Sequence, residues 1–296
     1  MARFHRVGVL KGGTSAEREV SLRSGAAIAR GLRDAGYEVV EIDVVEPVLT
    51  LPDSLDAVFI ALHGTFGEDG DVQRLLERAG IPYTGAGIAS SRDSFDKLRT
   101  KQILEEHGIS TPPFAVVSVG VERPLDVPVV VKPLRQGSSI GIHIVRDDAA
   151  WEKAICDAAQ FDRDILVESY VPGRELTVGI VGEQVLPVLE IRAPDGNYDY
   201  DAKYTAGATE YLVPAPLSPE VTACCQDLAK RTFDALRCRG LARVDLRLDD
   251  QEQAWVLELN TIPGFTETSL LPKAAQAAGI EFPTLCRGIM ETASLD

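Results

Sequence analysis

Two polar residues at the end of an apolar segment have the types and spacing of a metal site. In WVLELN (255–260), hydrophobic residues favour a β-strand, yet Glu258 and Asn260 close it. Because successive side chains of a strand alternate between its faces, these two point to the same side. A carboxylate and an amide oxygen on one face are typical ligands of a hard divalent cation.

A third oxygen ligand comes from the preceding segment. If residues 242–260 form a hairpin with its loop at 250–253, Asp245 lies directly across from Glu258. Two carboxylates facing each other across strands repel, so a positive charge is expected between them. Mg²⁺ takes one or two carboxylates together with substrate phosphates, and Mn²⁺ accepts similar ligands. We therefore predict a magnesium or manganese site at Asp245, Glu258 and Asn260.

The same polar face has a simpler interpretation. Arg243 and Arg247 follow the same two-residue period as Asp245 and could neutralise the acids, or all these side chains could face solvent. Three oxygen ligands on one face, followed by the turn TIPG, favour the metal.

A lysine before a glycine and serine loop indicates phosphate binding. The segment VVVKPLRQGSSIG (129–141) is an apolar strand that ends near Lys132 and runs into a loop. Backbone N–H groups of such a loop can surround a phosphate, and the lysine adds a charge. The segment lacks the GxxxxGK[ST] pattern of a P-loop, and an ordinary turn is the alternative. The loop residues concerned are Gly137, Ser138, Ser139 and Gly141.

Glu17 has both a structural and a functional interpretation. In KGGTSAERE (11–19) a glycine turn leads into a helix, and Thr14-x-x-Glu17 fits a capping box. The segment has no G-x-G-x-x-G fingerprint, so dinucleotide binding is not supported. From spacing alone, a helix cap is the preferred role of Glu17.

The segment ALHGTFGEDG (61–70) places His63 at a strand end and Glu68 in the following loop. Ligands of open α/β sheets bind beyond the carboxyl ends of the strands, so both side chains are positioned for binding. A histidine that bonds only to loop backbone is an equal alternative.

These residues need a framework of alternating strands and helices. Apolar segments at 6–10, 37–44 and 56–62 are typical of strands, with helices after the glycine turn and near 70–79. Such alternation implies a parallel sheet covered by helices. We therefore expect an α/β domain over about residues 1–95.

The remaining chain predicts further sheets and helices. Helices are expected at 91–108, 147–160 and 219–238, and a last one begins at 271–279. The polar segment 192–210 has no apolar periodicity, and loops of this length are usually functional or mobile. Short strands are expected at FAVVS, VPVVVKP, GIHIV, ILVESY, ELTVGIVG, QVLPVLEI, LARVDLRL and AWVLELN.

Composition excludes several classes of protein. The 296 residues carry a formal net charge of −15, which argues against a nucleic-acid partner. No apolar run approaches the roughly 18 residues of a membrane span, and VGVL near the start is too short for a signal peptide. The five cysteines lack metal-ligand spacing and are expected as free thiols in a reducing cytoplasm.

Motifs along nearly the whole chain, taken in order, resemble the D-alanine–D-alanine ligases of the ATP-grasp superfamily. The resemblance implies an N-terminal, Rossmann-like α/β domain over 1–95, followed by a two-lobed ATP-grasp fold with a central lobe at 96–180 and a C-terminal lobe at 181–296. A homodimer is typical of the family. The motifs are GGTSAEREVSLRSG, ALHGTFGEDG, PYTGAG, DKLRTK, VKPLRQGSSIGI, DYDAKY, ARVDLRL and LELNTIPGFTETSLLPKAA.

The resemblance also implies a nucleotide site between the two lobes. Asp245, Glu258 and Asn260 would hold two Mg²⁺ ions on the ATP phosphates. Glu168, Ser169 and Val171 would border the adenine and Glu175 would bind the ribose. The phosphate contacts would be Lys97, Lys132, Lys203 and the loop residues Gly137, Ser138 and Ser139.

Two D-alanine sites are implied next to it. Glu17 would bind the ammonium of the first D-alanine, with His63 nearby, and Arg243 with the Gly264 N–H would stabilise an oxyanion. Ser269 and Leu270, at a helix start, would position the carboxylate of the second D-alanine. Ser138 and Tyr204 would hydrogen-bond with Glu17 and close two loops over the site.

The implied reaction joins two D-alanines for peptidoglycan synthesis. The first carboxylate attacks the γ-phosphorus of ATP, and the second amine displaces phosphate from the resulting D-alanyl phosphate. A ligase that uses D-lactate as second substrate is the nearest alternative, with Tyr204 in the loop where such enzymes differ. A nucleotide-binding regulator without turnover is a more distant one.

Overall fold

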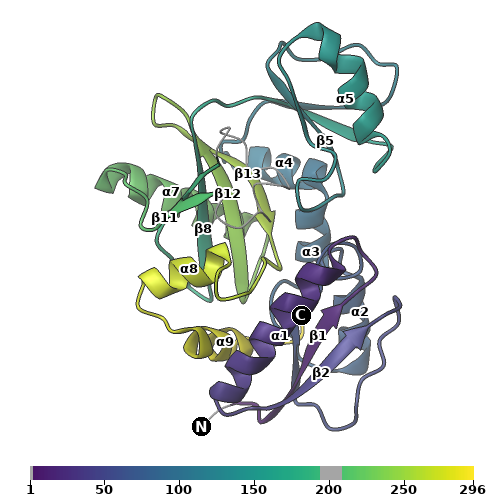
Figure 1. Cartoon of the computed structure of the whole chain (residues 1–296), viewed down its shortest axis with the longest axis vertical. Coiled ribbons are helices and arrows are strands. Elements are labelled where there is room, and N and C mark those ends of the chain that lie inside the picture. The colour runs from purple at the N-terminus through teal and green to yellow at the C-terminus, as the bar shows by residue number, and fades with distance from the viewer. Residues whose placement is uncertain (1–2, 194–208) are drawn as a thin grey trace.

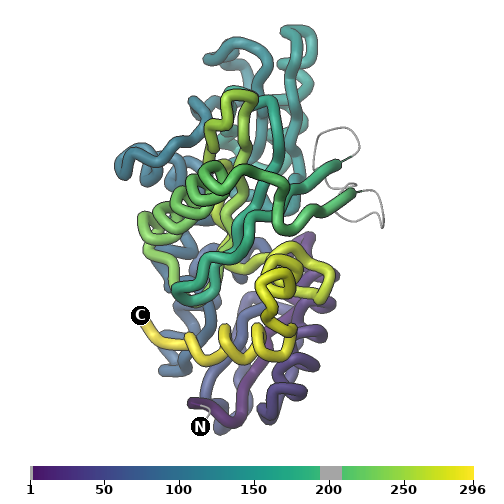
Figure 2. The backbone as a smooth tube through the Cα atoms, turned by 90° about the vertical axis from the view of Figure 1, so that its left-hand side faces the viewer, coloured from purple at the N-terminus to yellow at the C-terminus, as the bar shows by residue number. Residues whose placement is uncertain are grey.

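Three β-sheets with helices packed against them form the protein, in a computed structural model that describes residues 3–193 and 209–296 (Figure 1). The four-stranded sheet lies at the top of Figure 1, the six-stranded sheet in the middle and the three-stranded sheet near both termini. Figure 2, turned by 90°, shows the same order along the long axis. In the described ranges, no helix has the length and apolar character needed to span a membrane.

The three-stranded sheet is parallel, with the order β2-β1-β3, as the alternation of elements predicts. β1 is apolar because both its faces are covered, and Val7, Val9 and Leu10 are fully buried. The elements of this part are β1 (Arg6–Gly12), α1 (Arg18–Asp34), β2 (Glu38–Val44), β3 (Ala57–Ile60) and α2 (Asp71–Ala79).

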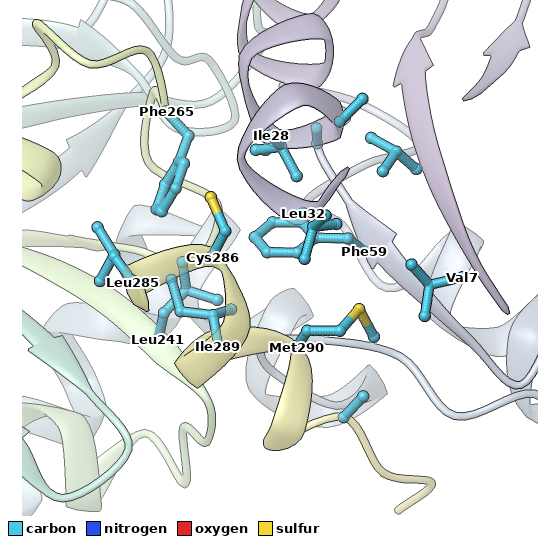
Figure 3. Close-up of a cluster of buried hydrophobic side chains, with 14 of the residues drawn as sticks. Val7, Ile28, Leu32, Phe59, Leu241, Phe265, Leu285, Cys286, Ile289 and Met290 are labelled. Atoms are coloured by element: carbon cyan, nitrogen blue, oxygen red, sulfur yellow. The ribbon is translucent and has the colours of Figure 1, made fainter. Parts of the chain in front are cut away.

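The last helix of the chain packs on α1 and β3. Figure 3 shows Leu32 and Phe59 beside Cys286 and Met290, and these side chains belong to one buried apolar cluster. A Cβ on Gly31 would lie 2.7 Å from the Cys286 sulfur, so only glycine allows this approach. The cluster fixes the C-terminal elements against the first sheet. They are α8 (Leu270–Ala277) and α9 (Phe282–Glu291).

The segment 91–108 forms two helices, not the single helix that we expected. α3 (Ile88–Phe95) ends at Asp96, whose backbone is extended, and α4 (Lys97–Glu106) begins immediately after it. The Asp96 side chain accepts a hydrogen bond of 3.1 Å from the Arg99 N–H and so caps α4. Aspartate favours such caps over helix interiors because its carboxylate competes for backbone N–H groups.

The four-stranded sheet is antiparallel, with the order β4-β7-β5-β6. Its helix α5 (Trp151–Ala158), preceded by the 3₁₀ turn η1 (Asp148–Ala150), covers one face, because Ile155 packs with Val129 and Val167 in one buried cluster. The strands are β4 (Phe114–Val117), β5 (Val129–Pro133), β6 (His143–Val145) and β7 (Ile165–Ser169).

The six-stranded sheet has the order β11-β10-β8-β12-β13, with β9 paired to β8. Helix α7 (Pro219–Ala235) covers one face of it, and Ser218 caps that helix. The segment QVLPVLEI, expected as one strand, is split into β9 and β10 around its proline. The strands are β8 (Arg174–Val181), β9 (Gln184–Val185), β10 (Leu189–Arg192), β11 (Glu210–Leu212), β12 (Leu241–Leu248) and β13 (Ala254–Asn260).

The hairpin of β12 and β13 has the predicted register at its polar end. Asp245 pairs with Glu258, and Arg243 pairs with Asn260. Nearer the turn the register shifts by one residue, which makes Leu257 the extra residue of a β-bulge. The loop at 249–253 is therefore one residue longer than expected.

The bulge decides which way the polar side chains point. Before it, Val256 is buried in the core under α7, and after it Leu259 continues that core. An unbroken two-residue period would place Glu258 and Asn260 on the core side with Val256. The bulge turns them to the opposite side of the sheet, next to Asp245.

Candidate active site

Two adjoining pockets share Glu258 in their walls. The larger pocket, about 520 Å³, lies between the start of α1, the loop after β3 and the segment that leads into α8. The smaller pocket, about 440 Å³, lies between the four-stranded sheet and strands β8, β12 and β13. Groups bound in the two pockets would therefore meet at Glu258.

Four hydrogen bonds hold Asp245, one of the predicted metal ligands. Arg243 donates to its two carboxylate oxygens at 2.8 and 2.6 Å, and the Thr177 hydroxyl donates at 2.7 Å. The Asn260 Nδ2 donates to Asp245 at 3.0 Å, which leaves the amide oxygen of Asn260 as its atom for a cation. The three predicted ligands thus lie together on one sheet face.

The charge around Glu258 is compatible with a divalent cation. The Lys97 Nζ lies 3.5 Å from Glu258 and donates to the Gln136 carbonyl at 2.7 Å. Across the described part of the chain, no three Asp, Glu, His or Cys side chains form a metal cluster. The oxygen set here is two carboxylates and one amide, which fits Mg²⁺ when substrate phosphates complete its coordination.

Glu17 does not form the predicted capping box. Helix α1 begins at Arg18, and the Glu17 side chain makes no capping hydrogen bond. Its carboxylate instead accepts a hydrogen bond from the Ser138 hydroxyl, 121 residues further along the chain. The cap interpretation is therefore wrong, because a loop from another sheet provides a stronger donor than the local backbone.

The loop after β5 is shaped to approach Glu17. A Cβ on Gly137 would lie 2.8 Å from a Glu17 carboxylate oxygen, so a larger residue would push the loop away. Ser138 and Ser139 have φ angles of +51° and +58°, in the left-handed region that residues other than glycine rarely adopt. Left-handed residues are common in turns whose backbone N–H groups bind anions.

His63 lines the larger pocket and is also held by its neighbours. Its Nε2 lies 3.4 Å from the Ser24 hydroxyl, and its carbonyl accepts a 2.7 Å hydrogen bond from Ser15. Burial lowers the pKa of His63, while the nearby Glu17 carboxylate acts in the opposite direction. The ring therefore contacts a serine of α1 and not only loop backbone, and a binding role for His63 stays a prediction.

Glu68 lies across the same pocket. It accepts a hydrogen bond of 2.7 Å from the Gly64 N–H. Burial, together with the negative charges of Glu17 and Glu258, raises the pKa of Glu68 to about 8. The side chain is therefore protonated at neutral pH and can donate a hydrogen bond.

Glu168 lies between two lysines in the wall of the smaller pocket. One carboxylate oxygen pairs with Lys132 of β5, and the other pairs with Lys101 of α4. Burial opposes ionisation of Glu168, but the two lysines outweigh it and lower its pKa. The sequence analysis missed Lys101, although it follows Lys97 by four residues and therefore lies on the same helix face.

The strand end after Glu168 continues the wall of the smaller pocket. Ser169, Val171 and Glu175 all line it. Arg247 donates to the Val171 carbonyl at 3.1 Å and to the Glu175 carboxylate at 3.3 Å. Arg247 thus fixes two predicted nucleotide contacts. Of the two arginines in the simpler interpretation, Arg243 does pair with the acid Asp245, whereas Arg247 pairs with Glu175.

The start of α8 closes the larger pocket. Ser269 is the extended residue before the helix, and its hydroxyl accepts a 3.0 Å hydrogen bond from the Thr266 N–H. Because this hydroxyl does not cap the helix, the first N–H groups of α8 are available to an anion. Gly264, Ser269 and Leu270 line the pocket together with Arg243.

Family models for this chain identify its relatives. The model described as the D-ala D-ala ligase C-terminus matches residues 103–291, and the model described as the N-terminus matches residues 45–86. The chain belongs to the D-alanine–D-alanine ligase family. Its architecture is accordingly an ATP-grasp fold that follows an N-terminal α/β part, as the sequence predicts.

Curated members of the family align over almost the entire chain. The D-alanine–D-alanine ligase of Methylacidiphilum infernorum is 48% identical over 98% of this chain and 95% of its own. That of Syntrophotalea carbinolica is also 48% identical, over 98% and 96%. A crystal structure of the Bacillus anthracis ligase superposes with a TM-score of 0.88 at 36% identity, covering 97% of both chains. A structure of that enzyme complexed with ATP gives a TM-score of 0.85.

The structure brings most residues expected from the family resemblance to these two pockets. Lys97 borders them through its contact with Glu258. Lys203 and Tyr204 lie outside the described residues. The larger pocket includes Glu17, His63, Gly137, Ser138, Arg243, Glu258, Asn260, Gly264, Ser269 and Leu270, and the smaller includes Lys132, Ser139, Glu168, Ser169, Val171, Glu175, Asp245 and Glu258.

Proposed function

We propose that the protein joins two D-alanines at the expense of ATP, through a D-alanyl phosphate, and so supplies a precursor for peptidoglycan. The observation that carries this proposal is the pair of pockets that share Glu258. An amino acid in the larger pocket and the phosphates of a nucleotide in the smaller pocket would meet at that wall. Family membership agrees with this arrangement.

The smaller pocket would bind ATP. Glu168, Ser169 and Val171 would border the adenine, and Glu175, held by Arg247, would accept hydrogen bonds from the ribose. Lys97, Lys132 and the N–H groups of residues 137–139 would bind the phosphates. Lys203 is proposed from the family motif to approach the γ-phosphate.

Asp245, Glu258 and Asn260 would hold two Mg²⁺ ions, or Mn²⁺ in their place, through their hard oxygen atoms. Bound metal supplies charge neutralisation on the phosphates of ATP. Arg243 and Lys97 balance the two carboxylates in the absence of that charge.

Glu17 and Arg243 would orient the first D-alanine in the larger pocket. The Glu17 carboxylate would bind its ammonium group, which points its carboxylate toward Arg243 and the shared wall. Arg243 and the Gly264 N–H would then stabilise the oxyanion that forms when the second amine attacks the acyl phosphate.

The first N–H groups of α8 would bind the carboxylate of the second D-alanine. Ser269 and Leu270 supply this site, where the helix dipole favours an anion. The hydrogen bond from Ser138 to Glu17 holds the loop after β5 over the first substrate. Such closure excludes water, which would hydrolyse an acyl phosphate. We propose that Tyr204 completes this closure.

The division into domains follows the sheets in our proposal. Residues 1–95 form the N-terminal domain, and the boundary between the two ATP-grasp lobes lies before Arg174. The boundary at residue 180 that the resemblance implies lies inside β8, which pairs with β12 along its whole length. We also propose a homodimer and a cytoplasmic location, the latter from the five free cysteines.

Phosphate release tests the proposed reaction. With ATP and Mg²⁺, D-alanine should give phosphate and a product with the mass of the dipeptide, and L-alanine should give neither. A depsipeptide from D-alanine plus D-lactate, without dipeptide from D-alanine alone, would move the substrate assignment to the D-lactate ligases. ATP binding without release from any pair would contradict the proposal and support a regulator.

A further inference from the structure

Lys101 is a fully buried cation to which the proposed mechanism gives no role. It lies in α4, one helical turn after Lys97, and its exposed fraction is 0%. Lysine is rarely buried completely, because transfer of an ammonium group from water is costly unless a partner compensates it. The groups that contact Lys101 therefore indicate its role.

Lys101 lies outside the smaller pocket and contacts Glu168 in its wall. Glu168 and Lys132 line that pocket, whereas Lys101 does not. Its Nζ pairs with Glu168 on the side away from Lys132 and donates to the Thr111 hydroxyl at 2.6 Å. Thr111 in turn donates to the Val256 carbonyl at 2.8 Å, next to the β-bulge of β13. The cation is therefore fixed between α4, β7 and the strand that carries Glu258.

This arrangement restricts the Glu168 carboxylate in charge and direction. One lysine alone could draw the carboxylate aside, but two lysines on opposite oxygens hold its plane in place. The burial that lowers the pKa of Lys101 to about 8 is opposed by Glu168, so each ion supports the charge of the other.

We infer that Lys101 is a positioning residue, which holds Glu168 as an ionised hydrogen-bond acceptor for the base of the nucleotide and, through it, holds Lys132 at the phosphates. This inference rests on the proposed use of ATP. An adenine amino group is a donor that such an acceptor recognises, whereas guanine presents a carbonyl oxygen at the same position and is repelled.

Lys101→Met tests the inference, since methionine has a similar length and no charge. We expect the KM for ATP to rise about ten- to a hundredfold, as for loss of a hydrogen bond to a charged group. The KM for D-alanine should stay unchanged, and the preference for ATP over GTP, measured as a ratio of kcat/KM, should fall. Thr111→Val keeps the charges of Lys101 and Glu168 and removes only the hydroxyl that orients Lys101. It should also raise the KM for ATP, but by a smaller factor than Lys101→Met.

Arg174→Met is the matched control. Arg174 pairs with the buried Glu190, which Arg192 also contacts, so this variant removes one of two cations from a buried carboxylate outside both pockets. We expect a loss of Tm, smaller than for Lys101→Met because Arg174 is partly exposed, with no change in the KM for ATP. If Lys101→Met and Thr111→Val also lower Tm and leave ATP binding and the ATP-to-GTP ratio unchanged, Lys101 only stabilises the fold and the inference is wrong.

Direct ATP binding by calorimetry separates this inference from the proposed reaction. A wild-type protein that binds ATP but makes no dipeptide would contradict the proposed function. The Kd for ATP of the Lys101 and Thr111 variants would still decide the inference, because it requires no turnover. Should Lys101→Met fail to fold, the Thr111 variant alone provides the test.

Discussion

Glu68 and Glu168 are carboxylates withdrawn from bulk water, yet their pKa values shift in opposite directions. Burial raises the pKa of each, but Glu68 also faces Glu17 and Glu258, which raise it further. Glu168 lies between Lys101 and Lys132, which reverse the effect of burial. Burial is the largest cause of the raised pKa of Glu68, whereas at Glu168 the charges of the two lysines outweigh it.

The difference divides the two pockets by chemistry. In the smaller pocket, which we propose binds the nucleotide, the Glu168 carboxylate is held between Lys101 and Lys132. In the larger pocket, burial and the neighbouring acids Glu17 and Glu258 favour the protonated form of Glu68. Glu258 belongs to both pockets, and its removal should therefore have the largest effect.

Glu258→Gln keeps the shape of the side chain and removes the charge that would bind the metal. Loss of a metal contact costs several kcal/mol of transition-state stabilisation, so we expect kcat to fall by about a thousandfold or more. Phosphate release under saturating substrates measures this. Glu252→Gln, in the exposed loop of the same hairpin, is the control and should retain activity. Near-normal turnover of Glu258→Gln would exclude the metal assignment.

Glu168→Gln tests the anion between the lysines. An amide leaves Lys101 and Lys132 without a counter-charge, and breaking such a buried pair typically costs about 3–5 kcal/mol of stability. We expect a lower Tm and an increase of about tenfold or more in the KM for ATP. Glu190→Gln, which removes a buried anion between two arginines outside the pockets, should lower Tm alone. If the KM for ATP of Glu168→Gln equals that of Glu190→Gln, Glu168 has no role in ATP binding.

Ser138→Ala removes the donor to Glu17, the acid that faces Glu68. A hydrogen bond to a charged group contributes roughly 1.5–3 kcal/mol, so the KM for the first D-alanine should rise by about tenfold. The KM for ATP should change less, because the backbone of the loop remains. Initial rates over a D-alanine series measure the difference. A change confined to ATP would indicate that the hydroxyl serves the phosphates.

Glu68→Gln should have the smallest effect at neutral pH, because the wild-type side chain is already protonated there. Between the ordinary value of 4.5 and the folded pKa of about 8, only the unfolded state loses the proton. The wild-type protein therefore loses stability as pH rises through this window, by at most about 1.4 kcal/mol per unit. The loss is complete above pH 8.

Thermal unfolding of both proteins, without metal or nucleotide, measures this linkage. The Tm of Glu68→Gln minus the Tm of the wild type should increase as pH rises from 5 to 8, because glutamine cannot ionise. Parallel curves over the whole range would mean that Glu68 ionises normally, and the contrast with Glu168 would then fail.

Local patterns predicted most of the elements, the polar face of the hairpin and the glycine and serine loop, whereas the other site residues were expected from the family resemblance. Buried strands such as β1 are continuous apolar runs, and the pairing of Asp245 with Glu258 follows from a hairpin with the correct spacing. Several expectations failed, and the following three show why. Asp96 caps a new helix, a proline divides the strand after β8, and Glu17 bonds to Ser138 in place of its own helix.

The sequence by itself determined which groups this protein has available, and in what order: the acids and amide of the hairpin, the lysines, and the glycine and serine loop. Their spacing sets which residues share a strand face or a helix face, because these periods are properties of the backbone. Only the tertiary structure decided where those faces point and what charge they carry. The bulge at Leu257 turns Glu258 away from the core. Burial and nearby acids then favour protonated Glu68, whereas two lysines favour ionised Glu168, since a pKa depends on the burial and the charges that the fold brings together from distant parts of the chain.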